Sequence, residues 1–270
     1  MSNRSVAVIT GGGTGIGAAT AKVLRSGGWE VVICGRRPEP LQRVAESTGA
    51  IPFVADAASA DDLKRLVGST LDKFGSLDGL VLNAGIVRAG LLSELTDGAW
   101  DDMVRTILTG PFRLLRAALP HLVAAKGAIV GVGSAAALRA TGGIPGYNAT
   151  KAALAMLMQT VAVDYGPQGV RANTVCPGWV RTEMADMEMR EIGTGLGVGY
   201  QEAYDIATSF VPARRAADAV EVAHLIAWLL SAQASYINAA VIPVDGGMVA
   251  GDPGSLALDP RVTFAQRHRD

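Results

Sequence analysis

Charge, cysteine and long apolar runs are all scarce in this sequence, and each scarcity excludes a class of protein. Charged residues make up 18% of the chain and almost cancel, with a formal net charge of −1, so no block of like charge predicts binding to nucleic acid or to a membrane surface. The two cysteines, Cys34 and Cys176, are far apart and lack metal-ligating neighbours, which predicts buried free thiols, no metal site and a reducing compartment. The first apolar run breaks at glycines near residue 11, too early for a signal peptide or a spanning helix, so we expect a cytoplasmic protein.

Apolar residues, in contrast, account for 49% of the 270 residues, which is typical of a folded globular protein with a large core. Short β-branched runs alternate with longer helical segments, and no Pro/Ser-rich linker divides them. We expect strands at 5–10, 30–35, 51–55, 77–82, 128–133, 170–175 and 239–244, and helices at 15–26, 39–47, 60–74, 100–125, 147–165 and 218–231. Repeated strand–helix units of this length predict an α/β fold, a single domain over residues 1–247 whose doubly wound parallel sheet carries helices on both faces.

Two segments interrupt the alternation. Residues 179–217 are long, rich in methionine and contain the glycine-rich run Gly193–Gly199; because they follow the sixth strand, we interpret them as a lid over a ligand crevice. Their large side chains suggest a mainly apolar substrate pocket, although packing of the lid onto the domain is the alternative: Met184, Met187, Met189, Tyr200, Tyr204 and Phe210. For the polar tail, residues 248–270, a frayed end and packing on a neighbouring subunit both stay open.

A glycine-rich turn stands between the first expected strand and the first helix. Residues 10–17 read TGGGTGIG, in which Gly11, Gly15 and Gly17 allow a tight turn and a close approach of backbone to a pyrophosphate at the helix N-terminus. No Gly-Lys-Ser/Thr follows, which argues against a Walker-type NTPase. A plain structural turn is the alternative, but the strand–turn–helix context favours a dinucleotide site.

A second polar group consists of Ser134, Tyr147 and Lys151. Ser134 follows an apolar strand, whereas Tyr147 and Lys151 open a helix about one turn apart and share a face. A nearby positive charge favours a phenolate, so Lys151 is expected to lower the pKa of Tyr147 from about 10. Such a tyrosine can act as a general acid and base, with Ser134 donating to the same substrate oxygen. A solvated helix face would explain the Tyr-x-x-x-Lys spacing alone.

Five motifs in order resemble those of the short-chain dehydrogenase/reductase family. They are TGGGTGIG at 10–17, LNAG at 82–85, Ser134, YNATK at 147–151 and NTVCPGWVRT at 173–182, and the resemblance extends to VDGG at 244–247. It implies a Rossmann-type doubly wound parallel sheet of seven strands and hydride transfer between a nicotinamide dinucleotide and a ketone or secondary alcohol. It also implies a dimer or tetramer, which agrees with the apolar residues on more than one face of helix 147–165.

The resemblance also assigns roles residue by residue. It makes Ser134, Tyr147 and Lys151 the catalytic set. It implies cofactor-binding roles for Gly11, Thr14, Gly15, Ile16, Gly17, Arg36, Arg37, Asp56, Asn83, Ala84, Gly85, Tyr147, Lys151, Pro177, Gly178, Val180 and Thr182.

The choice of cofactor turns on the end of the second strand. NAD-using relatives often carry an acid there, whereas this chain has Arg36 and Arg37, and a guanidinium pairs with a phosphate. We therefore predict NADP(H) over NAD(H), with solvated surface arginines as the alternative, although Thr14 stands where many NADP-using relatives have a basic residue. Asp56 resembles the family's adenine-contacting aspartate, and a cap for the next helix is the competing interpretation.

One position departs from the family pattern. The family carries an asparagine in the helix before the fifth strand, associated with a kink and with a water that leads protons to the catalytic lysine, and Ile107 takes that position here. Pro111 has no N–H, so the helix should bend and the Ile107 carbonyl should lose its helical partner. Either that carbonyl holds the relay water, or Ile107 is ordinary core and the relay is absent or slower.

Two other classes of protein compete with a dehydrogenase that acts on a small, mainly apolar carbonyl or alcohol. A serine hydrolase would need a G-x-S-x-G elbow, which is missing, and a base for Ser134. The three histidines occur in helical stretches or in the tail: His121, His224 and His268. A catalytically weak cofactor-binding or structural subunit of the same fold remains an alternative because of Ile107.

Overall fold

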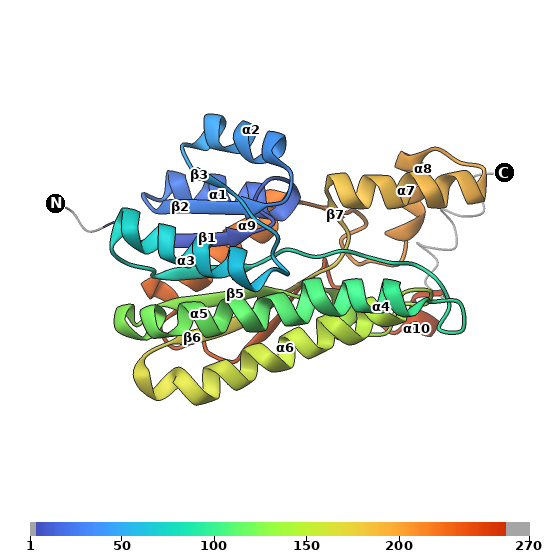
Figure 1. Cartoon of the computed structure of the whole chain (residues 1–270). Helices are drawn as coiled ribbons and strands as arrows, with labels where there is room; N and C mark the ends of the chain where they lie inside the picture. Colours follow the sequence, from blue (N-terminus) through green and yellow to red (C-terminus); the bar gives the residue numbers. More distant parts are fainter. Residues whose placement is uncertain (1–3, 258–270) are drawn as a thin grey trace.

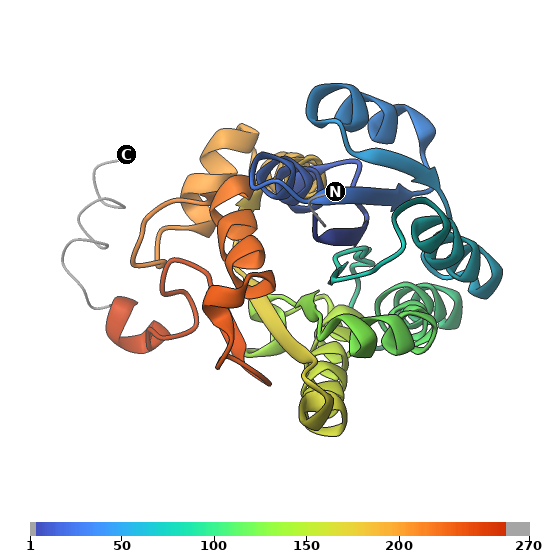
Figure 2. The same cartoon turned by 90° about the vertical axis from the view of Figure 1, so that its left-hand side faces the viewer.

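A computed structural model describes residues 4–257, in which one sheet lies between two layers of helices (Figures 1 and 2). Its strands are β1 (Val6–Thr10), β2 (Glu30–Gly35), β3 (Ile51–Val54), β4 (Gly79–Leu82), β5 (Ala128–Val132), β6 (Arg171–Pro177) and β9 (Val241–Val244). All neighbouring strands are parallel, in the order β3-β2-β1-β4-β5-β6-β9. The predicted doubly wound α/β fold is confirmed.

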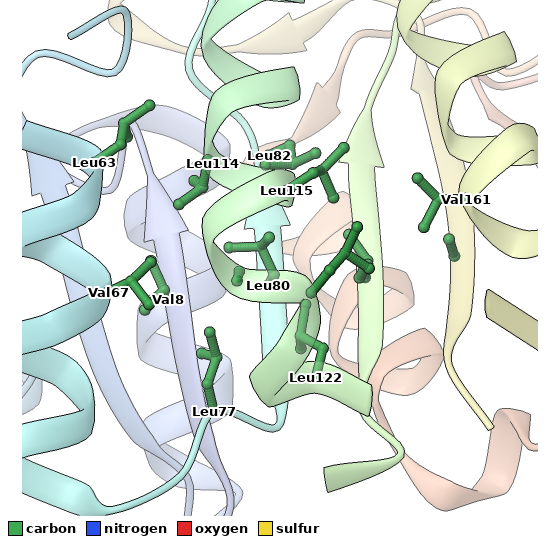
Figure 3. Close-up of a cluster of buried hydrophobic side chains, with 14 of the residues drawn as sticks. Val8, Leu63, Val67, Leu77, Leu80, Leu82, Leu114, Leu115, Leu122 and Val161 are labelled. Atoms are coloured by element: carbon green, nitrogen blue, oxygen red, sulfur yellow. The ribbon is translucent and has the colours of Figure 1, made fainter. Parts of the chain in front are cut away.

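The strands are apolar on both faces because helices cover both. In β1, Val8 points into one buried cluster, and Ala7 and Ile9 point into another on the opposite face. Figure 3 shows the first cluster, between the sheet and α3 (Ala60–Phe74), α5 (Gly110–Ala125) and α6 (Pro145–Tyr165). The second lies against α1 (Gly15–Ser26), α2 (Pro38–Thr48) and α9 (Ala219–Leu230). The continuous burial of the strands follows from these two layers.

The helix expected at 100–125 is divided into three parts. α4 (Asp97–Val104) leads into a π-helical turn, Arg105–Thr109, and α5 follows. The Gly110 N–H donates to the carbonyl of Arg105, five residues back, and Pro111 has no N–H to continue the ladder. A widened turn therefore interrupts the helix directly before Gly110 and Pro111. The side chain of Ile107 in this turn is fully buried in the first cluster.

The segment interpreted as a lid contains regular structure. It holds α7 (Glu183–Leu196), α8 (Tyr200–Ala207) and a small parallel pair of strands, β7 (Val180–Arg181) and β8 (Ala217–Asp218). Five buried residues form a separate apolar cluster between these helices: Ala185, Met189, Ala203, Tyr204 and Ala216. Met189 and Tyr204 thus pack inside the segment, as the packing alternative expected. The other four of the six large side chains that were expected to form a pocket stay exposed: Met184, Met187, Tyr200 and Phe210.

The end of the described chain lies on the same side of the molecule as α7 and α8 (Figure 1). α10 (Pro253–Ala257) follows β9, and the Arg139 guanidinium donates to the Gly251 carbonyl at 2.8 Å. Residues 258–270 of the expected tail lie outside the described residues. No helix in residues 4–257 is both long enough and apolar enough to cross a membrane.

Candidate functional site

The polar motifs meet at one edge of the sheet. The strand order reverses between β1 and β4, and such a switch point opens a crevice at the carboxyl ends of the strands. The glycine-rich turn follows β1, the Asn83–Gly85 loop follows β4, Ser134 follows β5, and Pro177 ends β6. Motifs that are far apart in the sequence are therefore gathered at the carboxyl ends of the strands.

The glycine-rich turn has a backbone conformation that favours glycine. Gly11 and Gly15 have φ angles of 65° and 53°, in the left-handed region. A side chain at Gly17 would start 2.3 Å from the Gly11 carbonyl oxygen, so the first turn of α1 packs directly on the loop. Within the described chain no side chain caps α1 and no acid occupies its first turn, which leaves its N–H groups open to an anion. The turn therefore fits the pyrophosphate of a dinucleotide.

A buried threonine that the sequence did not single out fastens this turn to the loop after β4. The Thr10 hydroxyl accepts from the backbone N–H groups of Asn83 and Ala84, at 3.0 and 3.1 Å, and donates to the Val81 carbonyl at 3.3 Å. The Asn83 amide donates to the carbonyls of Thr10 and Gly11, at 2.9 and 3.0 Å. Asn83 and Ala84 thus shape the predicted cofactor trough through its backbone. The position of Thr10, a polar residue at the end of an otherwise apolar strand, could have pointed to this role.

The three predicted catalytic residues lie together beyond β5. Ser134 precedes a short 3₁₀ turn and accepts from the Ala136 N–H at 3.1 Å. Lys151 is only 3% exposed and donates to the Val132 carbonyl at 2.6 Å. Its Nζ atom lies 5.5 Å from the centroid of the Tyr147 ring.

Lys151 also borders the cofactor loop. A side chain placed at Gly85 would come within 3.5 Å of the Lys151 Nζ, so the loop after β4 approaches the ammonium closely. The catalytic set and the predicted trough are therefore one continuous site.

The prediction that the pKa of Tyr147 is lowered is wrong. Burial raises the pKa of Tyr147 to about 12, while hydrogen bonding with Ser134 opposes the rise and the Glu188 carboxylate adds to it. The ammonium faces the Val132 carbonyl and lies over the ring, so desolvation of the phenol dominates. The phenol holds its proton at neutral pH and is suited to donate it.

Burial acts in the opposite sense on Lys151, because it disfavours the charged amine. It lowers the pKa of Lys151 to about 8. Glu188, half-buried on α7, was not among the predicted site residues, because its proximity to Tyr147 depends on how the lid segment folds back.

The end of β2 presents Arg36 and Arg37 as exposed side chains. Arg37 forms an ion pair with Glu183, the first residue of α7, at 3.0 Å. Sequence reasoning missed this acid, since 146 positions separate the partners. Asp56, after β3, accepts from the Ala58 N–H at 2.9 Å, whereas Ser59 caps α3; the cap interpretation of Asp56 is wrong.

The remaining predicted residues lie where the lid segment leaves the sheet. The Gly178 N–H donates to the Val244 carbonyl at 3.1 Å, and Val180 is buried. Thr182 caps α7 through the Ala185 N–H, at 3.2 Å, and a side chain at Gly15 would start 3.0 Å from its methyl group. The base of the lid thus lies directly on the glycine-rich turn. Ile16 packs against the second buried cluster.

The described residues contain no group of three or more His, Cys, Asp or Glu side chains arranged to hold a metal ion. The groups that the site does offer are glycine-turn amides, a helix N-terminus, two arginines, a phenol, a hydroxyl and an amine.

Comparison with known proteins places these features in a family. A family model described as "Enoyl-(Acyl carrier protein) reductase" matches residues 11–249. The chain is 40% identical to protein MoaE of Klebsiella aerogenes, covering 94% of this chain and 98% of that protein, and 34% identical to meso-2,3-butanediol dehydrogenase of Serratia marcescens, covering 93% and 96%. The crystal structure of L-sorbose reductase from Gluconobacter frateurii, complexed with NADPH and L-sorbose, superposes with a TM-score of 0.87 at 29% identity, covering 93% of this chain and 98% of that chain. The chain therefore belongs to the short-chain dehydrogenase/reductase family.

Proposed function

We propose that this protein transfers a hydride between a nicotinamide dinucleotide and a small ketone or secondary alcohol, with Ser134, Tyr147 and Lys151 as its catalytic residues. The observation that carries the proposal is the meeting of these three side chains, beyond β5, with the glycine-rich turn after β1. When bound, the dinucleotide supplies or accepts the hydride. The amides of the turn would hold its pyrophosphate, and Gly85 and Lys151 would contact it on the side of the catalytic residues.

The protein's own part is proton transfer and orientation. Tyr147, whose pKa burial raises, is protonated at neutral pH and donates to the carbonyl oxygen in the reductive direction. Ser134 donates to the same oxygen and stabilises charge as it develops. Lys151 is fixed by the Val132 carbonyl, so its amine holds one position beside the phenol.

NADP(H) is the proposed cofactor over NAD(H). Arg36 and Arg37 supply cationic groups at the end of β2, where a Rossmann-type fold distinguishes the ribose 2′-phosphate from the 2′-hydroxyl. The structure of L-sorbose reductase, which was solved with NADPH, supports this choice by family likeness.

A small, mainly apolar carbonyl or alcohol is the proposed substrate class. The exposed Met184, Met187, Tyr200 and Phe210 of the lid segment support an apolar wall. The names of butanediol dehydrogenase and L-sorbose reductase support a small alcohol or carbonyl substrate, whereas the apolar character of the substrate rests on the lid residues alone.

We further propose that the protein is a homo-oligomer in the reducing environment of the cytoplasm. α5 and α6 leave large apolar side chains uncovered, with Phe112, Met156 and Val163 exposed by 48%, 62% and 71%, and a second subunit would bury them. Both cysteines are free and buried. Light scattering on the purified protein measures the assembly.

Tyr147→Phe tests the catalytic assignment. The variant should bind NADPH as the wild type does and lose nearly all turnover, because a ring without its hydroxyl cannot donate the proton. Turnover is measured on a panel of ketones and alcohols, and binding by nicotinamide fluorescence. Preserved turnover would reject the assignment, and binding by the wild type without turnover on any substrate would favour the cofactor-binding subunit instead.

A further inference from the structure

The ion pair between Arg37 and Glu183 joins the expected cofactor-binding residues after β2 to the first helix of the lid segment. Arg37 follows β2 and precedes α2, and Glu183 opens α7. The guanidinium and the carboxylate lie 3.0 Å apart, and both side chains are more than half exposed. Each charge holds the pKa of the other away from its ordinary value, raised for Arg37 and lowered for Glu183. Glu183 therefore stays ionised at neutral pH.

This pair affects the expected choice between NADP(H) and NAD(H). In a Rossmann-type fold the residue after the second strand reads the ribose, through an acid for the 2′-hydroxyl or an arginine for the 2′-phosphate. In the sequence, two arginines and no acid directly follow β2. In the folded chain, however, α7 brings an acid to this position, and its carboxylate already occupies a guanidinium that a phosphate would need.

The placement of Glu183 is fixed by the base of the lid. Its neighbour Thr182 caps α7, and the methyl group of Thr182 packs over Gly15 in the glycine-rich turn. A carboxylate in the first turn of a helix is also favoured there by the helix dipole. Arg36 is exposed and makes no ion pair in residues 4–257, so it remains able to receive a phosphate on its own.

We propose that Glu183 is a specificity-determining residue, which weakens the preference of the site for the 2′-phosphate of NADP(H) by neutralising Arg37. The inference rests on the proposed dinucleotide-binding function. A 2′-phosphate that reaches Arg37 has to displace the carboxylate and then lie beside it, and this costs both an ion pair and a like-charge repulsion. The 2′-hydroxyl of NAD(H) meets neither cost, because it is neutral and can donate to the carboxylate.

Glu183→Gln tests the proposal, with dissociation constants for NADPH and NADH measured by nicotinamide fluorescence without substrate. An exposed pair and a repulsion of similar size together correspond to about a three- to tenfold gain in NADPH affinity at low salt. NADH affinity should stay within about twofold or fall. The gain should shrink as salt is added, because exposed charges are screened.

Two further variants serve as controls. Glu39→Gln removes another carboxylate whose charge acts on Arg37, but one that is not ion-paired with it, so the ratio of the two affinities should move little. In an Arg37→Gln background, Glu183→Gln should no longer favour NADPH, because the group that Glu183 neutralises is gone. Adenosine 2′-monophosphate as competitor should follow NADPH across the series.

The outcomes distinguish a failure of the role of Glu183 from a failure of dinucleotide binding. If the wild type binds both dinucleotides and Glu183→Gln changes their ratio by less than about twofold, the inference is overturned and the proposed function stands. An equal change in Glu39→Gln also overturns it, since general charge would then explain the effect. If the wild type binds neither dinucleotide, the proposed function itself fails.

Discussion

Thr10→Val is expected to destabilise the protein far more than its small change in shape suggests. Valine has nearly the same volume as threonine, but it removes the hydroxyl that joins the glycine-rich turn to the loop after β4. Thr10 is only 4% exposed. Its hydroxyl accepts hydrogen bonds from two backbone N–H groups and donates one to a carbonyl. Each unsatisfied amide costs about 1–3 kcal/mol, and both lie near the open crevice, so the free energy of unfolding should fall by about 2–3 kcal/mol.

Thr10→Ser is the matched control. It keeps the hydroxyl and loses one methyl group, which costs about 1 kcal/mol. Urea unfolding of the two variants compares them directly, and the slope of the transition should stay unchanged. Dinucleotide affinity should also fall in Thr10→Val only, because Asn83 and Ala84 would no longer be held against the turn. If the two variants are equally stable to within about 0.5 kcal/mol, the hydroxyl does not hold the turn and this account of the site is refuted.

Two other predictions concern the interior near the catalytic residues. Ile107→Asn should lower the free energy of unfolding by about 1–3 kcal/mol, because it buries an amide in an apolar cluster. It should not raise turnover if the Ile107 carbonyl already replaces the family's asparagine in the proton relay. A large rise in turnover would argue against that replacement. Burial lowers the pKa of Lys151 to about 8, against about 10.4 when unfolded, so at this position the unfolded chain binds more protons between these values, and Lys151 contributes stability that rises with pH across that window. Lys151→Met should lack that contribution, so urea unfolding at both ends of the window should show the wild type gaining stability relative to the variant as the pH rises. An identical pH dependence in both proteins would contradict the assignment.

The fold was predictable because its signal is local and repeated. β-branched runs such as Val6–Thr10 and the segments between them fix the alternation of strands and helices, and the buried pattern of β1 follows from its composition. The lid segment was harder. Gly193–Gly199 suggested a loop, yet Leu196 ends α7 at a left-handed Gly197 and a second helix begins at Tyr200. Packing of the two helices on each other, which no local pattern reports, stabilises them.

The candidate site divides in the same way. Gly17 and the ordered motifs were predictable, since their spacing reflects backbone constraints that act over a few residues. The pKa of Tyr147 was not, because it depends on desolvation and on a distant Glu188, neither of which spacing can show. The Arg37–Glu183 pair was likewise hidden, as complementary charges 146 positions apart form no motif. Contacts made across the fold, not within a segment, account for what the sequence could not predict.

The separate apolar cluster of α7 and α8 has a consequence for how this protein could diversify. Because Met189 and Tyr204 pack against each other's helices, and the Tyr204 hydroxyl donates to Asp186 at 2.9 Å, the helical pair carries part of its own stability. Outward-facing positions such as Met184 and Met187 can then change without disturbing the sheet. Evolution, or an engineer, could vary these outward-facing positions to change substrate choice, provided that Glu183 and Glu188, whose charges act on Arg37 and Tyr147, are kept.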